Sequence, residues 1–329
     1  MSASGTQEVN KRLIKRINNL IENEPDYIKG FSSFLNYSSL GTKYTYLTYV
    51  INFIRYIQKD PCEYSLEDFL YYIERNKYKD NGEQNTQSYQ IAVYSALKKF
   101  SEYLFVSKKT SEHFMKYVHR PKAFDNQKTI EKRMNGFLET EEIKDVLIAL
   151  EKNDVNMYRQ SGKRTNFRDK LIIKTLLITG MRCTALVKLD KNSVDFSNNI
   201  LITTDKGNKV KTFEMPQEYM DDLKEWIKLR DGVANSDTDA LFVTKYGKRI
   251  TQESVSKVTL KYSKRIKGKH ITPHKLRATY GTQLYDNTGD IYFVQECMGH
   301  NSPKTTELYI RGSKNRTKDA ASIINKIIK

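Results

Sequence analysis

The chain of 329 residues has few of the residue types that mark secreted or disulfide-stapled proteins, with only 3 Cys, 6 Pro and 15 Gly. Cys62, Cys183 and Cys297 are widely spaced, and none belongs to a C-x-x-C pair or to a Cys/His pattern typical of zinc. We therefore expect buried, reduced thiols and a reducing compartment. A small disulfide scaffold is excluded.

Long apolar runs are also missing. The longest stretches, residues 171–178 and 320–328, each contain a lysine and fall short of the roughly 20 residues that a bilayer-spanning helix needs. The basic start of the chain, with Lys11 and Arg12, is not followed by the apolar region of a secretory signal. We expect a soluble, cytoplasmic protein with no membrane partner.

Positive charge is abundant. Lys and Arg total 56 against 39 Asp and Glu, a formal net charge of +17. Because 38% of the residues are hydrophobic and 11% aromatic, the charge belongs to folded structure and not to a disordered basic tail. This balance predicts a polyanionic partner, and duplex DNA suits basic residues spread over a whole chain.

The first third of the sequence has the periodicity of helices. After the cap-type residues Ser38, Ser39 and Thr42, apolar side chains recur at three- and four-residue steps from Tyr44 to Ile57. Similar patterns follow up to Phe105. Residues 120–136 are polar and charged, without apolar periodicity. We predict an all-helical domain of four or five helices over residues 1–119 and a linker over 120–136.

The remainder, residues 137–329, mixes both kinds of structure. Helices are predicted after Thr140 and over residues 169–180. Alternating residues between 194 and 215 indicate short strands around the turn 205–209, and 241–244 suggests another strand. Helices resume from Thr251. The predicted fold class is mainly α with a small antiparallel β-sheet.

Four short segments of this second region carry unusual polar residues. They are Thr179-Gly-Met-Arg182, Asp205-Lys-Gly-Asn-Lys209, Thr272-Pro-His-Lys-Leu-Arg277, and Met298-Gly-His300 followed by Tyr309. Their order is similar to the active-site pattern of the tyrosine recombinases, also called the phage integrase family. The resemblance covers residues 137–312, and it implies a mixed α/β catalytic domain preceded by a helical core-binding domain.

The residue types suit attack on a phosphodiester, which gathers negative charge as phosphorus becomes five-coordinate. Arg182 and Arg277 can each offer paired planar donors to the nonbridging oxygens, and His300 can add another donor. A cationic pocket favours the phenolate of a tyrosine, whose pKa is ordinarily about 10. Tyr309 is then the expected attacking group.

The resemblance assigns further roles. It implies a covalent 3′-phosphotyrosyl intermediate on Tyr309, with Lys206 as general acid for the leaving 5′-oxygen and His274 as the group that takes and returns the tyrosine proton. No cofactor and no metal is implied. Lys209 and Lys211 lie close to Lys206, so the residues alone leave the choice of lysine open.

The sequence departs from the family pattern at two places. Ala185 stands where an acidic residue is common, and Ala278 follows Arg277 where a histidine is common. At both positions the usual family residue helps to orient the arginines, and Asp169 is a candidate to supply these contacts instead.

We hypothesise a site-specific DNA recombinase of the two-domain Xer, transposon or integron type, because the segment before residue 25 is too short for a separate arm-binding domain. The family also implies a C-terminal docking segment, residues 313–329, that assembles a homo-tetramer on two DNA duplexes. Accessory DNA-binding proteins are additional expected partners. The DNA contacts that we predict are Lys43, Lys98, Lys99 and Lys209.

Two alternatives stay open. A type IB topoisomerase uses a similar set to nick and reseal one strand, and a catalytically silent DNA-binding relative would keep only the fold. Exchange between paired sites distinguishes a recombinase from the first, and covalent chemistry distinguishes it from the second.

Overall fold

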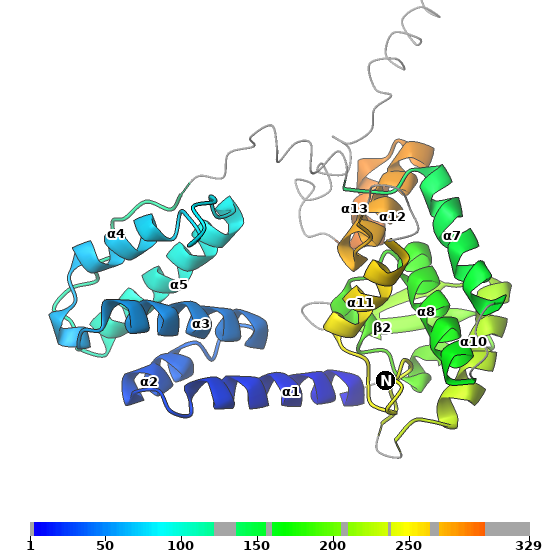
Figure 1. Ribbon diagram of the computed structural model, residues 1–329, viewed down its shortest axis with the longest axis horizontal. Helices are drawn as coiled ribbons and strands as arrows, with labels where there is room; N and C mark the ends of the chain where they lie inside the picture. Colours follow the sequence, from blue (N-terminus) through cyan, green and yellow to red (C-terminus); the bar gives the residue numbers. More distant parts are fainter. Residues whose placement is uncertain are drawn as a thin grey trace, which may run out of the picture. The chain divides into compact units, whose positions relative to one another are not determined.

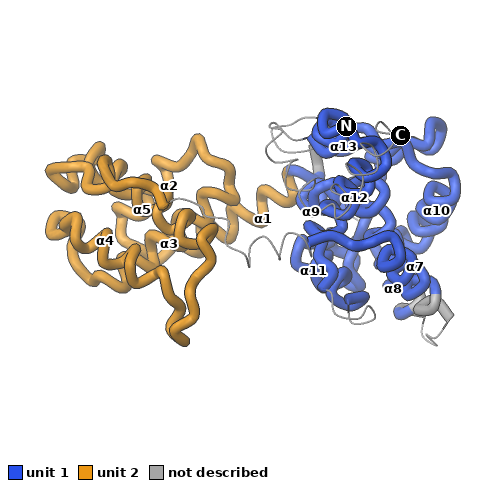
Figure 2. The backbone as a smooth tube through the Cα atoms, turned by 90° about the horizontal axis from the view of Figure 1, so that it is seen from above, with its two compact units in different colours: residues 1–6, 126–329 blue, residues 7–125 orange. Residues whose placement is uncertain are grey.

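The computed structural model describes residues 3–121, 136–155, 160–204, 210–235, 238–263 and 270–299. It divides into two compact units, residues 7–125 and residues 1–6 together with 126–329 (Figure 2). The described parts are mainly helical, with a small three-stranded antiparallel sheet (Figure 1). The predicted fold class is confirmed.

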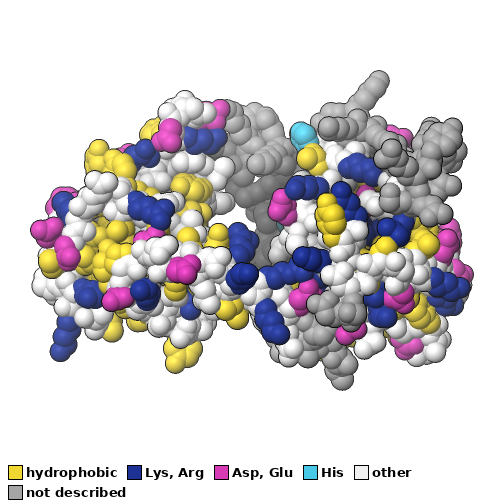
Figure 3. Space-filling model, turned by 60° about the horizontal axis from the view of Figure 1, so that its bottom comes forward, with side chains coloured by type: hydrophobic (Ala, Val, Ile, Leu, Met, Phe, Trp, Pro, Cys, Tyr) yellow, Lys and Arg dark blue, Asp and Glu magenta, His cyan; other side chains and the backbone are white. Residues whose placement is uncertain are grey.

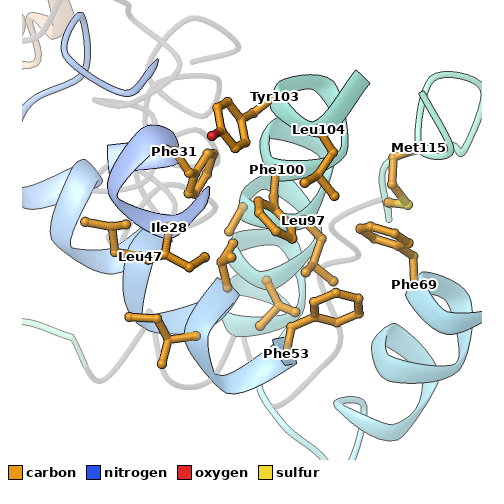
Figure 4. Packing of buried hydrophobic residues seen from close by; sticks show 14 of the residues in the cluster. Ile28, Phe31, Leu47, Phe53, Phe69, Leu97, Phe100, Tyr103, Leu104 and Met115 are labelled. Carbon is orange, nitrogen blue, oxygen red and sulfur yellow. The ribbon is translucent and has the colours of Figure 1, made fainter. Parts of the chain in front are cut away.

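The unit of residues 7–125 is built from helices. Helix α3 begins at the position that the cap residues predict. Ser39 is its N-cap, and the Oγ of Ser39 accepts the N–H of Thr42 at 3.2 Å. Aromatic rings dominate the core, as Figure 4 shows for Phe31, Phe53 and Phe100, which are fully buried. The helices are α1 (Ala3–Ile21), α2 (Asp26–Phe34), α3 (Leu40–Ile57), η1 (Pro61–Glu63), α4 (Leu66–Arg75) and α5 (Gln87–Val106).

The larger unit surrounds a small sheet with helices (Figure 1). The strands lie in the order β1-β2-β3, and β2 and β3 pair so that Leu201 faces Phe213 and Thr203 faces Lys211. Helix α8 packs against α7, α10 and α12. The elements are α7 (Thr140–Val155), α8 (Gln160–Thr179), α9 (Cys183–Leu186), η2 (Lys191–Ser193), β1 (Val194–Asp195), β2 (Ile200–Thr204), β3 (Val210–Glu214), α10 (Gln217–Asp231), α11 (Gln252–Ser263), α12 (Pro273–Thr288) and α13 (Ile291–Met298).

The first turn of α1 groups with the larger unit, although the sequence placed it in the N-terminal domain. Gly5 donates its N–H to Oδ2 of Asp190 at 3.1 Å, and Asp190 forms a buried ion pair with Arg249. A Cβ on residue 5 would lie 2.3 Å from the carbonyl oxygen of Lys188. Only glycine fits this contact.

The strand predicted at residues 241–244 is wrong. Two of its carbonyl groups are bound by side chains and not by a neighbouring strand: Trp226 Nε1 donates to Leu241 at 2.8 Å, and Arg168 Nη1 donates to Val243 at 2.9 Å. Only isolated bridges occur here, such as the one between Val243 and Arg249. The run of apolar residues therefore marks a buried segment that helix side chains help to hold, and not a strand.

In the described part of the chain, no helix has the length and hydrophobicity needed to cross a membrane. The cysteines are free thiols. Cys183 and Cys297 are partly buried, while Cys62 is exposed, so the expectation of buried thiols is wrong for Cys62.

Candidate active site

Two of the predicted site residues lie at the start of α12. Thr272 caps this helix, because its Oγ1 accepts the N–H of Lys275 at 3.1 Å, and Pro273 occupies the first helical position. Both are favoured at helix starts. His274 and Arg277 follow at a spacing that places them on the same side of the helix.

Arg277 connects two segments that are far apart in the sequence. The residue is buried, with a relative exposure of 6%. Its Nη1 donates to the carbonyl oxygen of Gly180 and its Nη2 to that of Met298, both at 2.6 Å. Gly180 follows α8, and Met298 is the last residue of α13. One guanidinium therefore joins α12 to the ends of two other helices.

Gly180 allows the chain to turn sharply after α8. Its φ is +56°, in the left-handed region that favours glycine, and its N–H donates to the carbonyl of Leu176 at 3.0 Å. A Cβ here would lie 2.2 Å from the ring of Tyr280 on α12. The turn is thus closely fitted between α8 and α12.

Arg182 stands directly after this turn. It is the N-cap of α9 in an extended conformation, and its carbonyl oxygen accepts the N–H of Ala185 at 2.8 Å. Its side chain is half-buried. Because Gly180 is bound by Arg277, the main chain that leads to Arg182 is fixed to the helix that carries His274.

The imidazole of His274 favours its neutral form. The residue is exposed to solvent, yet partial desolvation and the positive charge of Arg277 both lower the pKa of His274 below its ordinary value. A neutral imidazole near pH 7 can accept a proton. This is the state that the predicted acid/base role requires.

The pKa of Tyr280 is raised, whereas an activated tyrosine nucleophile would need a lowered one. Burial, and the nearby thiol of Cys297, raise the pKa of Tyr280 to about 12. Its hydroxyl therefore stays protonated at neutral pH, and its ring serves to pack against Gly180.

The other predicted site residues lie outside the described residues. They are Lys206, Lys209, His300 and Tyr309. Lys206 and Lys209 fall in the chain between Thr204, the last residue of β2, and Val210, the first of β3, and His300 follows Gly299, the C-cap of α13.

Two contacts near the site were not foreseen correctly. Asp169 binds Arg168 at 2.6 Å and Lys261 at 3.3 Å, instead of either predicted arginine. Lys211, which the sequence offered only as a neighbour of Lys206, donates to the carbonyls of Glu296 and Cys297. Because residues two apart on a strand share a face, the apolar Phe213 could have indicated that Lys211 points inward.

The helical unit holds a cationic pocket of about 650 Å³. Lys98 and Lys99 line it, and Lys43 does not. Lys98 donates to Tyr94 Oη and to the carbonyl of Lys116, both at 3.3 Å, whereas Lys99 is paired with Glu102 at 2.9 Å. The remaining lining residues are Tyr46, Ser95, Tyr117, Val118, His119 and Arg120.

The sequence pattern of the phage integrase family matches residues 136–316, which is more than half of the chain. The chain belongs to this family. By sequence the chain is also similar to tyrosine recombinase XerC of Alcanivorax borkumensis, to which it is 33% identical over 144 residues, covering 43% of this chain and 47% of that protein.

XerC of Vibrio cholerae is 28% identical over 216 residues, covering 65% of this chain and 64% of that protein. The chain thus spans about half to two thirds of the length of these curated relatives.

Solved structures share the fold of this protein. The XerH site-specific recombinase bound to palindromic difH substrate aligns with a TM-score of 0.71 at 19% identity, covering 96% of this chain and 89% of that chain. A λ integrase dimer bound to a COC′ core site aligns with a TM-score of 0.63 at 14% identity, covering 88% and 96%. The Tn1549 transposon integrase with circular intermediate DNA gives 0.57 at 17%, covering 86% and 94%.

Gly180→Ala is expected to destabilise the protein more than Gly289→Ala. Both glycines have positive φ, which costs an alanine roughly 1–2 kcal/mol. A Cβ at Gly289 meets nothing within 4 Å, whereas one at Gly180 displaces the ring of Tyr280. The added overpacking should cost about 1–3 kcal/mol more. Urea unfolding of the two variants measures the difference, and equal losses would contradict the close fit.

His274 is expected to titrate below pH 6.5, its ordinary value. The folded protein then binds fewer protons than the unfolded chain, so stability rises with pH from the lowered folded pKa up to about 6.5. NMR titration in buffer and in denaturant measures both midpoints, and His274→Gln identifies the resonance. A folded midpoint at or above the unfolded one would contradict the lowering of the His274 pKa by desolvation and by the charge of Arg277.

Proposed function

We propose that this protein is a site-specific DNA recombinase that cuts and rejoins strands through a covalent 3′-phosphotyrosyl intermediate on Tyr309. The main support is the buried guanidinium of Arg277, whose bonds hold the segments that lead to Arg182 and to His300. Membership of the family and a net charge of +17 agree with a DNA substrate.

The proposed reaction proceeds at one phosphodiester. The phenolic oxygen of Tyr309 forms a bond to phosphorus while His274 takes its proton, and the bond from phosphorus to the 5′-oxygen breaks. Lys206 donates a proton to that oxygen. Arg182, Arg277 and His300 stabilise the charge on the nonbridging oxygens. A 5′-hydroxyl from another strand then reverses the steps and reseals the DNA.

The cationic pocket of the helical unit is the proposed site for the phosphate backbone. Lys and Arg side chains are distributed over the visible face of both units, with acidic groups between them (Figure 3). In the pocket, Lys98, Lys116 and Arg120 stand beside the exposed ring of Tyr117. This combination of cations and aromatic surface suits a sugar-phosphate chain.

We further propose double-stranded DNA with specific recombination sites as the partner, and a homo-tetramer joined by residues 313–329 as the active assembly in the cytoplasm. In this proposal residues 1–119 form the core-binding domain, 120–136 the linker and 137–329 the catalytic domain. The similar XerH recombinase was crystallised on its difH substrate, and the λ integrase as a dimer on a core site, which supports DNA as partner and assembly of several copies.

Tyr309→Phe is expected to abolish covalent attachment while leaving DNA binding intact. The full-length protein is incubated with a random pool of duplexes that carry a nick near the reacting phosphate, so that the cleaved fragment diffuses away and traps the adduct. Mass spectrometry then locates the modified residue. Tyr292→Phe is the matched control, because Tyr292 is 72% exposed on α13.

The outcomes separate the candidate functions. An adduct that persists in Tyr309→Phe would refute the assignment of the nucleophile. An adduct on Tyr309 with supercoil relaxation but no exchange between two sites would identify a type IB topoisomerase. Tight binding with no adduct on any duplex would identify a silent DNA-binding protein.

Lys98→Ala is expected to weaken DNA binding more than Lys99→Ala. Loss of one phosphate contact lowers the slope of log K against log salt by about 1. Glu102 already compensates the charge of Lys99, so this neighbour contributes less. Fluorescence anisotropy over a salt series measures both slopes. Lys79→Ala, which removes an exposed lysine paired with Glu83 outside the pocket, should leave the slope unchanged. Equal slopes for all three variants would exclude the pocket.

A further inference from the structure

The C-terminal end of α13 is held by an unusual set of donors. A helix end leaves its last carbonyls without partners inside the helix. Here the N–H of Gly299 donates to the carbonyls of Gln295 and Glu296. Lys211 Nζ donates to the carbonyl oxygens of Glu296 at 3.3 Å and of Cys297 at 2.9 Å. Arg277 Nη2 donates to the carbonyl oxygen of Met298. Two cations thus bind the negative end of this helix.

Lys211 reaches this position from the inner face of the sheet. On β3 it alternates with exposed neighbours and shares a face with Phe213, with its Nζ 5.9 Å from that ring's centroid. Its partner across the pair is Thr203, which is buried. An inward-facing ammonium is costly unless it finds acceptors. The carbonyls of Glu296 and Cys297 supply them, at a partly buried contact.

The two elements that Lys211 joins each lead to a residue of the proposed reaction. The β2–β3 hairpin carries Lys206 between its strands, and α13 ends just before His300. Resting on the proposed function, we propose that Lys211 is a positioning residue: it fastens β3 to the C-terminus of α13 and so fixes the strand that follows Lys206, the proposed general acid for the leaving 5′-oxygen.

The chemistry of the leaving group tests this role directly. A 5′-oxygen leaves only with a proton, whereas a 5′-sulfur in a bridging phosphorothiolate leaves as a thiolate, because thiols ionise near pH 8.5. A defect in delivering the proton therefore shrinks when sulfur replaces oxygen. A defect in folding or in DNA binding does not depend on that atom.

The experiment measures single-turnover cleavage by full-length Lys211→Met on a nicked duplex recovered from the random pool, with oxygen or sulfur at the 5′ bridge. With oxygen we expect a loss on the order of 10–100-fold at saturating protein. With sulfur we expect Lys211→Met to cleave at a rate within about threefold of that of the unmodified protein. We expect the same of Lys206→Met on this substrate. The ratio of the two rates compares substrates on one preparation, so partial unfolding cancels.

Two further variants complete the design. Lys211→Arg keeps a cation that can donate to the carbonyls, and it should restore the oxygen rate to within about threefold. Lys174→Met is the matched control, because it removes a partly buried lysine that binds Asp222 at 3.1 Å between α8 and α10. Lys174→Met lowers the net charge by the same amount as Lys211→Met and should leave the ratio of the oxygen and sulfur cleavage rates unchanged.

The failures are distinguishable. If the unmodified protein forms no adduct on Tyr309, the proposed function fails. If it forms the adduct and Lys211→Met cleaves normally, or is slowed equally on both substrates, only the positioning role of Lys211 is overturned.

Discussion

The bonds from the Arg277 guanidinium to two main-chain carbonyls organise the larger unit. They bring the end of α8 and the end of α13 to the first turns of α12. Both acceptors stand at helix C-termini, where aligned peptide dipoles place partial negative charge. A buried cation needs such partners. These two hold it without adding a formal negative charge, which keeps the surroundings attractive to a phosphate.

Much of the fold could be predicted because its signals are local. Ser39 at the start of α3, and Thr272 with Pro273 at the start of α12, satisfy helix N–H groups or fix φ within a few residues. The residues at 241–244 were misread because their pattern is that of a strand. Two of their carbonyls, those of Leu241 and Val243, accept hydrogen bonds from Trp226 and Arg168, which lie on helices outside the segment and leave no local signal in its sequence.

The residues of the site could be predicted from the sequence better than the contacts that position them. Arg182, His274 and Arg277 stand out by type and order, and these are properties of the sequence itself. The contacts that position them join a side chain to a main-chain atom far away, and every residue has a carbonyl. For this reason Lys211 was seen only as a neighbour of Lys206, and Asp169 was assigned to arginines that it does not bind.

The use of carbonyl acceptors has a consequence for how this site can change over time. A carboxylate partner is lost by a single codon change, but a carbonyl oxygen remains whatever side chain its residue carries. The turn at Gly180 must keep its glycine, because of its φ and the ring of Tyr280. At Met298 and Cys297 the acceptors impose no such demand. Substitutions such as Ala185 and Ala278 can then accumulate around the arginines while their anchoring to the main chain persists.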